Sequence, residues 1–272
     1  MSAMKDCREV SLSIVIPAYN EEQRLTSTLA TVIEYASHNE WKWVEIIIVN
    51  DGSLDGTAEL VTRSMRRYPR LRLVNYQPNR GKGNAVREGM LHATGDWRLF
   101  SDADLSTPLA EVKTLFCAAR SRHADIVIAS RALDRSLIGR HQSGLREFAG
   151  RIFNVCVQLL TGLPLSDTQC GFKLFSAKSA EQVFRLQRLD GFGFDVEVLF
   201  IGKQLGIRIA EVATRWSHAD GTKVSMFGDS FRMFGDLFRI RYSWILGLYG
   251  TRAPRREWER TEQTLKNIHT QL

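Results

Sequence analysis

The chain has 272 residues, of which 44% are hydrophobic and 25% charged, a balance that excludes wholesale disorder and allows one large domain or two small ones. Its formal net charge of +7, from 37 Lys+Arg against 30 Asp+Glu, favours an anionic partner: a nucleotide, a phospholipid surface or nucleic acid. Its four cysteines are widely spaced and form no CxxC pair, which argues against a zinc site or a disulfide framework and suits a reducing compartment.

The start of the chain, MSAMKDCREV, reaches an apolar run without a basic region, a long apolar stretch or a small-residue cleavage site. We therefore expect no signal peptide. No window of about 18 uninterrupted apolar residues occurs, so no membrane-spanning helix is expected. The sequence predicts a cytoplasmic protein whose association with a membrane would be peripheral.

The first half of the chain alternates short β-branched runs with segments of helical spacing. Strands are predicted at 11–17, 44–49, 71–75, 97–101 and 126–130, and helices at 21–37, 57–68, 83–93 and 109–120. This alternation predicts a parallel sheet with helices on both faces. Ligands of such sheets bind beyond the carboxyl ends of the strands, so the residues that follow each strand are the candidate site.

The pattern changes after Arg131. Residues 132–144 are polar and basic and predict a mobile loop. Beyond it we expect helices at 143–162 and 195–205, a turn and strand at 167–175, a strand at 207–216, an aromatic and arginine-rich segment at 230–249, and a loose charged tail from 251.

Two aspartates one residue apart follow the strand expected at 97–101. Asp102 and Asp104 stand in SDADLSTP, and paired carboxylates at a strand end suit a hard divalent cation shared with phosphate oxygens. Mg²⁺ or Mn²⁺ there would neutralise a leaving diphosphate. The competing interpretation is a turn in which Asp104 or Ser106 caps the helix after Pro108. The pair alone favours the turn, but its place after three other motifs reverses this and favours the metal.

Those three motifs follow the first three expected strands. PAYNE places Tyr19 and Glu21 after the first strand, NDGSLDGT places Asp51 at the end of the second, and NRGKGN places Lys82 after the third. An aromatic ring and acids suit a nucleoside, while glycines and a lysine suit a phosphate. Each motif also fits an ordinary turn between strand and helix. The lysine motif is not a Walker P-loop, because GxxxxGK[ST] is absent.

The order of the motifs resembles a known family. IPAYNEE, VNDGSLDGT, NRGKGNAVREG and SDADLSTP, in this order, resemble the family 2 glycosyltransferases with the GT-A fold. Further along, Ser130-Arg131, DTQCGFKLF, GFDVEVL and the stretch from Trp216 to Val224 are similar to the dolichyl-phosphate β-glucosyltransferase branch, close to the polyprenyl-phosphate mannosyltransferases. The resemblance runs from about residue 11 to residue 224.

This resemblance implies the fold and the domain organisation. The fold class is α/β, with a GT-A (Rossmann-like), mostly parallel central sheet, helices on both faces and C-terminal amphipathic helices. The glycosyltransferase domain would span 1–224, an amphipathic helical segment that docks on membranes 225–250, and a charged tail 251–272.

The resemblance also implies which residues bind the donor. Pro17, Tyr19, Glu21 and Asp51 would hold the base and ribose of a sugar nucleotide, with UDP-glucose favoured, and Lys82 would approach the phosphates or the sugar. Asp102 would orient metal or sugar, and Asp104 would be the direct ligand of Mg²⁺ or Mn²⁺.

For the acceptor, the resemblance implies a polyprenyl phosphate, dolichyl or undecaprenyl. Arg131 would bind its phosphate as a catalytic residue, with Arg146 and Lys223 as helpers. Arg151 competes with Arg146 for this role, because both lie in the helix after the basic loop. The alternative for each arginine is a solvated face, and for Lys223 a loop charge.

The implied reaction is in-line attack of the acceptor phosphate on the anomeric carbon of a hexose, with inversion. A phosphomonoester has a second pKa of about 6, so it is ionised at neutral pH and scarcely needs a general base. Basic residues would instead relieve its repulsion by the donor diphosphate. A hydroxyl acceptor would call for a carboxylate base, for which Asp195 or Glu197 is a candidate. Both also suit structural pairing with Arg131 or Lys173, which we favour.

The segment 230–249 bears on the acceptor, because a polyprenyl phosphate lies in a bilayer. It combines Phe231, Phe234, Leu237, Phe238 and Trp244 with Arg232, Arg239 and Arg241. This composition fits a basic amphipathic surface that docks on a membrane, and it fits equally a core helix with arginines on its wet side.

Three alternative functions differ in acceptor or in class. In the first alternative, an enzyme of the same fold transfers sugar to a hydroxyl of a saccharide. The second is a nucleotidyltransferase that forms a sugar nucleotide, which would want a glycine- and arginine-rich signature where this chain has PAYNEE. The third is nucleic-acid binding, suggested only by the net charge and the tail TRAPRREWER, whose glutamates dilute its basic residues. We expect no nucleic-acid partner.

Overall fold

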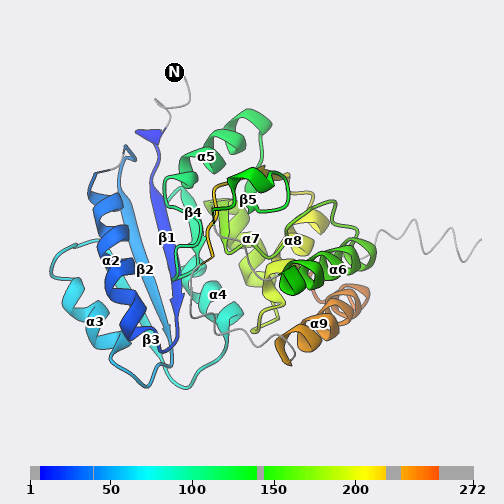
Figure 1. Cartoon of the computed structure of the whole chain (residues 1–272), viewed down its shortest axis with the longest axis horizontal. Coiled ribbons are helices and arrows are strands. Elements are labelled where there is room, and N and C mark those ends of the chain that lie inside the picture. Colours follow the sequence, from blue (N-terminus) through cyan, green and yellow to red (C-terminus); the bar gives the residue numbers. More distant parts are fainter. Residues whose placement is uncertain (1–6, 39, 140–143, 219–227, 251–272) are drawn as a thin grey trace, which may run out of the picture.

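A seven-stranded sheet forms the centre of the molecule (Figure 1). The computed structural model describes residues 7–38, 40–139, 144–218 and 228–250, with the side chains of 145–149 and 228–231 left out. The strands are β1 (Leu12–Ala18), β2 (Val44–Asp51), β3 (Leu71–Tyr76), β4 (Trp97–Ser101), β5 (Ile126–Ser130), β6 (Phe172–Ser176) and β7 (Ile209–Ala213).

The strand order is β3-β2-β1-β4-β6-β5-β7, and all neighbours pair in parallel except at β6. That strand runs antiparallel to both β4 and β5. Because β1 to β4 are mutually parallel, their carboxyl ends share one edge of the sheet. The prediction of a mostly parallel sheet is therefore confirmed, and the first four strand-end motifs meet at that edge.

Helices cover both faces of the sheet, as expected for a doubly wound fold. One face carries α2 (Glu22–Ser37), α3 (Thr57–Ser64) and α5 (Glu111–Arg122), and the other carries α4 (Lys82–His92), α6 (Gly144–Thr161), α7 (Ala177–Leu186), α8 (Phe194–Gln204) and α9 (Gly228–Ile245). The helices bury apolar side chains at helical spacing, such as Leu25, Leu29 and Val32 of α2.

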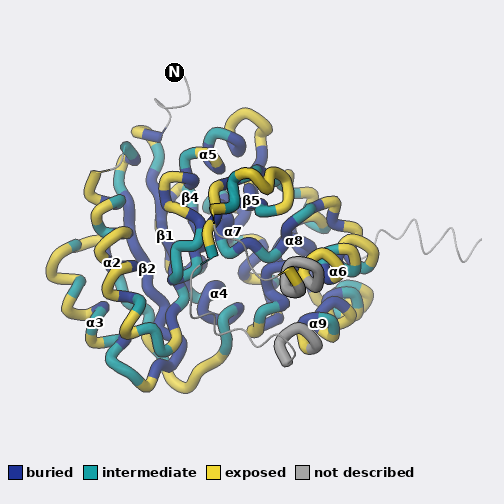
Figure 2. Tube along the Cα trace, in the orientation of Figure 1, coloured by how far each residue is buried: buried dark blue, intermediate teal, exposed yellow. Residues whose placement is uncertain are grey.

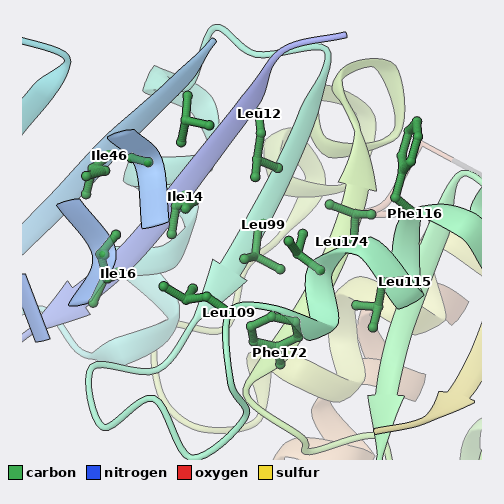
Figure 3. Close-up of a cluster of buried hydrophobic side chains, with 14 of the residues drawn as sticks. Leu12, Ile14, Ile16, Ile46, Leu99, Leu109, Leu115, Phe116, Phe172 and Leu174 are labelled. Carbon is green, nitrogen blue, oxygen red and sulfur yellow. The ribbon is translucent and has the colours of Figure 1, made fainter. Parts of the chain in front are cut away.

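The central strands of the sheet are almost entirely buried, as the dark β1 and β2 of Figure 2 show, whereas the edge strands β3 and β7 are only partly buried. On one face, Leu12 and Ile14 of β1 lie with Leu99 of β4 and Leu115 of α5 in a single apolar cluster (Figure 3). Strands buried on both faces need continuous β-branched runs rather than alternation, which is what VEIIIV in β2 supplies.

Some expectations need correction. Helix α7 was not expected, although Ser176 caps it by accepting a hydrogen bond from the Ser179 amide at 3.2 Å. The helix expected at 57–68 ends at Ser64, and the strand expected at 207–216 is reduced to Ile209–Ala213. The loop expected at 132–144 includes a short 3₁₀ helix, Arg135–Leu137, ahead of residues 140–143, which lie outside the described part.

Helices α6 and α9 pack against each other, and α9 also packs against α8 (Figure 1). Phe153 of α6 meets Phe234 of α9 edge to face, with ring centroids 5.2 Å apart. Leu237 and Ile240 of α9 are fully buried in the same core as the sheet. Within the described residues, no helix is long and apolar enough to cross a membrane. The domain division at 224 falls among residues 219–227, outside the described part, and stays a prediction.

The amino ends of the strands, opposite the strand-end motifs, are tied by a buried carboxylate. Glu45 of β2 accepts hydrogen bonds from the Ser13 hydroxyl at 2.5 Å, from the Thr94 amide at 2.5 Å and from Arg72 at 3.2 Å. Burial raises the pKa of Glu45, but these hydrogen bonds outweigh burial and hold its pKa below the usual value. The ionised form therefore stabilises the fold.

We expect Glu45→Gln to lower the free energy of unfolding by about 2 kcal/mol at pH 7, because charge-assisted hydrogen bonds are replaced by weaker neutral ones. A depressed acid pKa contributes stability above the unfolded pKa and loses it as the pH falls through the folded pKa. The difference in the free energy of unfolding between wild type and variant should therefore be largest at pH 7 and shrink below pH 4.5. Urea denaturation at pH 7, 5 and 4 measures this difference. A difference independent of pH would contradict the role of the Glu45 charge.

Candidate active site

A cavity of about 410 Å³ opens at the carboxyl ends of β1, β2 and β4 and the start of α4. We call it the acid pocket. Its lining includes all seven residues predicted for the donor and the metal: Pro17, Tyr19, Glu21, Asp51, Lys82, Asp102 and Asp104. The structure thus brings together residues that the sequence spreads over 88 positions, from four separate strand-end motifs.

Asp51 organises one wall of the acid pocket. Its carboxylate accepts hydrogen bonds from the backbone amides of Arg80 at 2.8 Å and Gly81 at 2.9 Å, and from the Asn79 side-chain amide at 2.9 Å. Gly81 has φ 102° and lies so close to the Asp190 carbonyl that a Cβ would meet its oxygen at 2.5 Å, so only glycine fits. Asp51 therefore fixes the loop that leads into Lys82, a role that the sequence did not reveal.

Lys82 and Asp102 form an ion pair inside the acid pocket. Lys82 Nζ lies 2.7 Å from Asp102 Oδ1 and over the faces of Phe100 and Phe192, with ring centroids 5.4 and 5.8 Å away. Burial lowers the pKa of Lys82, but Asp102, Asp195 and Asp104 outweigh burial and raise it. Lys82 is therefore a fixed positive charge beside two acids, suited to a diphosphate.

Asp104 belongs to a turn, but it does not cap the next helix. Its Oδ1 accepts a hydrogen bond from the Ser106 amide at 3.0 Å. Helix α5 begins at Glu111, and its N-cap residue Ala110 provides no side-chain cap. The capping interpretation of Asp104 and Ser106 is therefore wrong.

The two aspartates fit a hard divalent cation. Both carry carboxylate oxygens and line one pocket, and Mg²⁺ is typically bound by one or two carboxylates together with substrate phosphates. Within the described residues no group of three or more His, Cys, Asp or Glu side chains is placed to hold a metal. Asp102 and Asp104 thus match the kind of site that phosphate oxygens complete.

Arg131, directly after β5, is held by a partner that the sequence analysis missed. Its Nε and Nη2 donate to the two oxygens of Asp167 at 2.7 and 2.8 Å, and its backbone amide donates to Asp167 Oδ2 at 3.0 Å. Its guanidinium also lies over the Trp216 ring, 5.4 Å from the centroid. Burial lowers the pKa of Arg131, but the Asp167 carboxylate outweighs burial and raises it. Of the two cations considered as partners for Asp195 and Glu197, Arg131 is therefore not the one.

A second cavity, of about 680 Å³, lies beside Arg131. We call it the arginine pocket. Arg135 and Arg151 also line it, with the polar side chains of Asn154 and Gln169. Arg146 and Arg151 were the alternative candidates for contact with the acceptor. Arg151 lines the pocket, whereas the side chain of Arg146 lies outside the described part. Lys223 also lies outside the described residues.

The two acids of FDVE have structural partners. Asp195 pairs with Lys173, whose Nζ lies 2.5 Å from Asp195 Oδ1. This is the structural pairing that we favoured over a role as catalytic base. Glu197 is fully buried and accepts hydrogen bonds from the Leu189 amide at 2.8 Å and the Tyr249 hydroxyl at 2.7 Å. Burial raises the pKa of both carboxyls. Neither residue lines the acid pocket or the arginine pocket, which supports the structural interpretation.

Solved structures share this fold. The glucosyl-3-phosphoglycerate synthase of Mycobacterium tuberculosis in complex with phosphoglyceric acid matches with a TM-score of 0.64 at 19% identity, over 87% of this chain and 82% of that one. The same enzyme in complex with Mn²⁺, UDP-glucose and phosphoglyceric acid matches with a TM-score of 0.62 over 92% and 84% of the two chains, at 19% identity. A mostly parallel sheet with two aspartates one residue apart, Asp102 and Asp104, at the end of β4 is the fold of a GT-A glycosyltransferase.

The chain belongs to glycosyl transferase family 2, whose domain matches residues 13–184. It is 38% identical to the dolichyl-phosphate β-glucosyltransferase of Dictyostelium discoideum, over 88% of this chain and 76% of the relative. The enzymes of the same name from Saccharomyces cerevisiae and Homo sapiens are 33% and 30% identical, each over 90% of this chain and 78% and 79% of the relative. The family excludes the nucleotidyltransferase alternative.

We expect Gly171→Ala to lower turnover by about 100-fold with little change in stability, because a misplacement of catalytic groups by about 1 Å has that effect. A Cβ on Gly171 would overlap the Asp102 carboxylate, which must then move. Steady-state kinetics and thermal unfolding measure the two effects.

Gly144→Ala is the matched control, because a Cβ at that position meets nothing within 4 Å. It should keep wild-type turnover. If Gly171→Ala also kept it, the contact between residue 171 and Asp102 would not be important for catalysis.

Proposed function

We propose that this protein transfers glucose from UDP-glucose to a polyprenyl phosphate, dolichyl or undecaprenyl, with inversion at the anomeric carbon. The observation that carries the proposal is the pair of pockets. One combines acids with a lysine, as a sugar nucleotide and its metal require, and the other gathers three arginines, as an anionic acceptor requires. The names of the relatives support the same donor sugar and the same class of acceptor.

The acid pocket is the proposed donor site. Pro17, Tyr19 and Glu21 line the part nearest β1 and would hold the base and ribose. Asp51 would contribute with them and through the loop that it fixes. Lys82, at the amino end of α4, would hold the diphosphate, because both its charge and the helix dipole favour an anion there.

Asp104 and Asp102 are the proposed ligands of Mg²⁺ or Mn²⁺, with Asp104 as the direct one. When bound, the cation would supply charge neutralisation for the leaving diphosphate. Asp102 also keeps Lys82 in place through their ion pair. The protein would thus present two cationic groups to the phosphates, the bound metal ion and Lys82, of which the second is built into the chain.

The arginine pocket is the proposed acceptor site. Arg131 would bind the acceptor phosphate, with Arg151 and Arg135 beside it and Arg146 and Lys223 as further proposed contacts. Asp167 holds the Arg131 guanidinium by its Nε and Nη2 edge, so the Nη1 edge is presented in a fixed direction. A phosphomonoester oxygen is ionised at neutral pH and needs positioning rather than a base. The structural engagement of Asp195 and Glu197 agrees with this assignment.

A membrane surface is the proposed partner of α6 and α9. Each helix buries one apolar face and exposes another: Ile152, Val155 and Leu159 on α6, and Phe238, Tyr242 and Ile245 on α9. Spacings of three and four residues place each exposed set on one side of its helix. Val155 also lines the arginine pocket, so the α6 set continues into the proposed acceptor site. The protein would act as a peripheral enzyme on the cytoplasmic face of a membrane.

The function is tested with UDP-glucose, GDP-mannose and UDP-N-acetylglucosamine as donors, each with a short polyprenyl phosphate or the matching polyprenol, and with Mg²⁺ or Mn²⁺. We expect product only with a divalent cation, most from UDP-glucose, and none with the polyprenol, whose hydroxyl lacks the phosphate charge. Folded protein that forms no product from any donor would refute the proposal. Transfer to the hydroxyl and not to the phosphate would support the alternative acceptor class.

In the same assay, Asp104→Ala should lower turnover by at least about 100-fold with an unchanged thermal midpoint, because the cation loses its direct ligand. Binding of Mn²⁺ in the presence of UDP, measured by calorimetry, should weaken in parallel. Wild-type turnover at saturating metal would contradict the ligand role.

Membrane docking is tested by flotation with vesicles of phosphatidylcholine and phosphatidylserine. Wild type should float with the vesicles, whereas the double variant Leu159→Glu/Phe238→Glu should stay below them, because each charge opposes burial of an exposed apolar side chain. Met65→Glu is the control and should float, because Met65 directly follows α3, which lies on the other side of the molecule from α6 and α9 (Figure 1). Wild type that does not bind the vesicles would contradict docking.

A further inference from the structure

Two ion pairs of buried or half-buried side chains connect the sheet with the acid pocket. Lys173 Nζ of β6 is 2.5 Å from Asp195 Oδ1 of α8, and Lys82 Nζ is 2.7 Å from Asp102 Oδ1. Both lysines lie at the ring of Phe100, which is 5.6 Å from Lys173 Nζ and 5.4 Å from Lys82 Nζ. The two ion pairs are therefore neighbours that share contact with one aromatic ring.

Lys173 reaches Asp102 by a second route, through the backbone. Its Nζ donates to the Cys170 carbonyl at 2.6 Å. The next residue, Gly171, accepts a hydrogen bond from the Asp102 amide at 3.0 Å, and its missing Cβ leaves room for the Asp102 carboxylate. Lys173 thus holds the residue directly before the glycine against which Asp102 rests.

The same segment reaches the arginine pocket at its other end. Asp167, six residues before Lys173, holds Arg131 by two hydrogen bonds. Residues 167–173 therefore connect the guanidinium of the proposed acceptor site with the carboxylate of the proposed donor site. With both ends anchored by ion pairs, the segment sets the spacing of the two pockets.

Stability alone does not account for this lysine. Lys173 is fully buried, and the side-chain exposure of Asp195 is 6%. Removing two charges from water is costly, and a buried ion pair can often be replaced by apolar residues of similar volume without loss of stability. Phe175, two residues further along β6 and therefore on the same face as Lys173, is fully buried, which shows that an apolar side chain packs well on this face of the strand.

We propose that Lys173 and Asp195 are positioning residues for Lys82 and Asp102, and that they preset the acid pocket for a nucleoside diphosphate. The proposal rests on the proposed donor site. It predicts that loss of the pair weakens the binding of the nucleotide and lowers kcat beyond any effect on folding.

Two variants test it. Lys173→Met/Asp195→Asn removes both charges, so that neither partner stays buried alone. Asp195→Asn keeps the shape of its side chain and an acceptor for Lys173 while removing the charge near Lys82. Binding of UDP with Mn²⁺ by calorimetry, kcat with UDP-glucose and polyprenyl phosphate, and urea unfolding are measured for each. Arg72→Met/Glu45→Gln, which removes an ion pair at the opposite edge of the sheet, is the matched control.

We expect the double variant to fold, to bind UDP at least about 5-fold more weakly and to lose at least about 10-fold in kcat, as preorganisation of charged groups predicts. Asp195→Asn should show the same direction with a smaller change. The control should keep its UDP affinity and kcat even where its stability falls. If the double variant does not fold, UDP binding and kcat of Asp195→Asn alone test the proposal.

The proposal is overturned if both variants bind UDP as wild type does, or if the control loses as much affinity for an equal loss of stability. UDP binding also separates this inference from the proposed function. Wild type that binds UDP but transfers no glucose refutes the function and leaves the positioning test intact, whereas wild type that binds no UDP overturns both.

Discussion

Parallel pairing of β1 with β2 and β4 is the constraint on which the donor side of the site depends. The register pairs Ala18 with Asn50 and Val15 with Phe100, so the segments that follow these strands emerge side by side. Each segment turns from strand to helix and has its own polar residues. The acid pocket is therefore a property of the sheet edge, and no single motif contains it.

Around this edge, charges are held in pairs whose members come from different elements. Lys82 of α4 pairs with Asp102 after β4, and Arg131 after β5 pairs with Asp167 ahead of β6. The carboxylate that fixes each cation is therefore not one of its immediate neighbours in the chain. Fixed charges need little reorganisation when an anion arrives, which is the physical basis of electrostatic catalysis. The two proposed phosphate sites follow the same design.

Much of the donor side could be predicted from the sequence, because it depends on local patterns. Runs such as VEIIIV identify buried strands, and strand ends identify the site residues, among them Asp51 and Lys82. The function of Asp51 as the anchor of Asn79–Gly81 was hidden, since it depends on which backbone amides turn toward it. Helix α7 was missed because its amphipathic pattern is short and directly follows a strand.

The acceptor side was less predictable because its contacts are long-range. Asp167 and Arg131 are 36 residues apart, and no periodicity links them. Lys173 stands in FKLFS, where a lysine is typical of an edge strand, yet β6 lies inside the sheet between β4 and β5. The topology shows that this lysine is buried, which is why it needs the counter-charge that Asp195 supplies. Arg151 and Arg146 were equivalent in sequence, since both lie in the same helix.

The reversed direction of β6 has a geometric consequence. A strand that runs against its neighbours begins where they end, so the peptide that enters β6 lies at the edge where β4 and β5 leave the sheet. In an all-parallel sheet, the chain would only leave strands at that edge. Here one segment also enters a strand there, and for that reason residues 167–171 lie between Arg131 and Asp102. An insertion in this short stretch would move the two apart while leaving every strand intact, so its length is constrained like that of a strand.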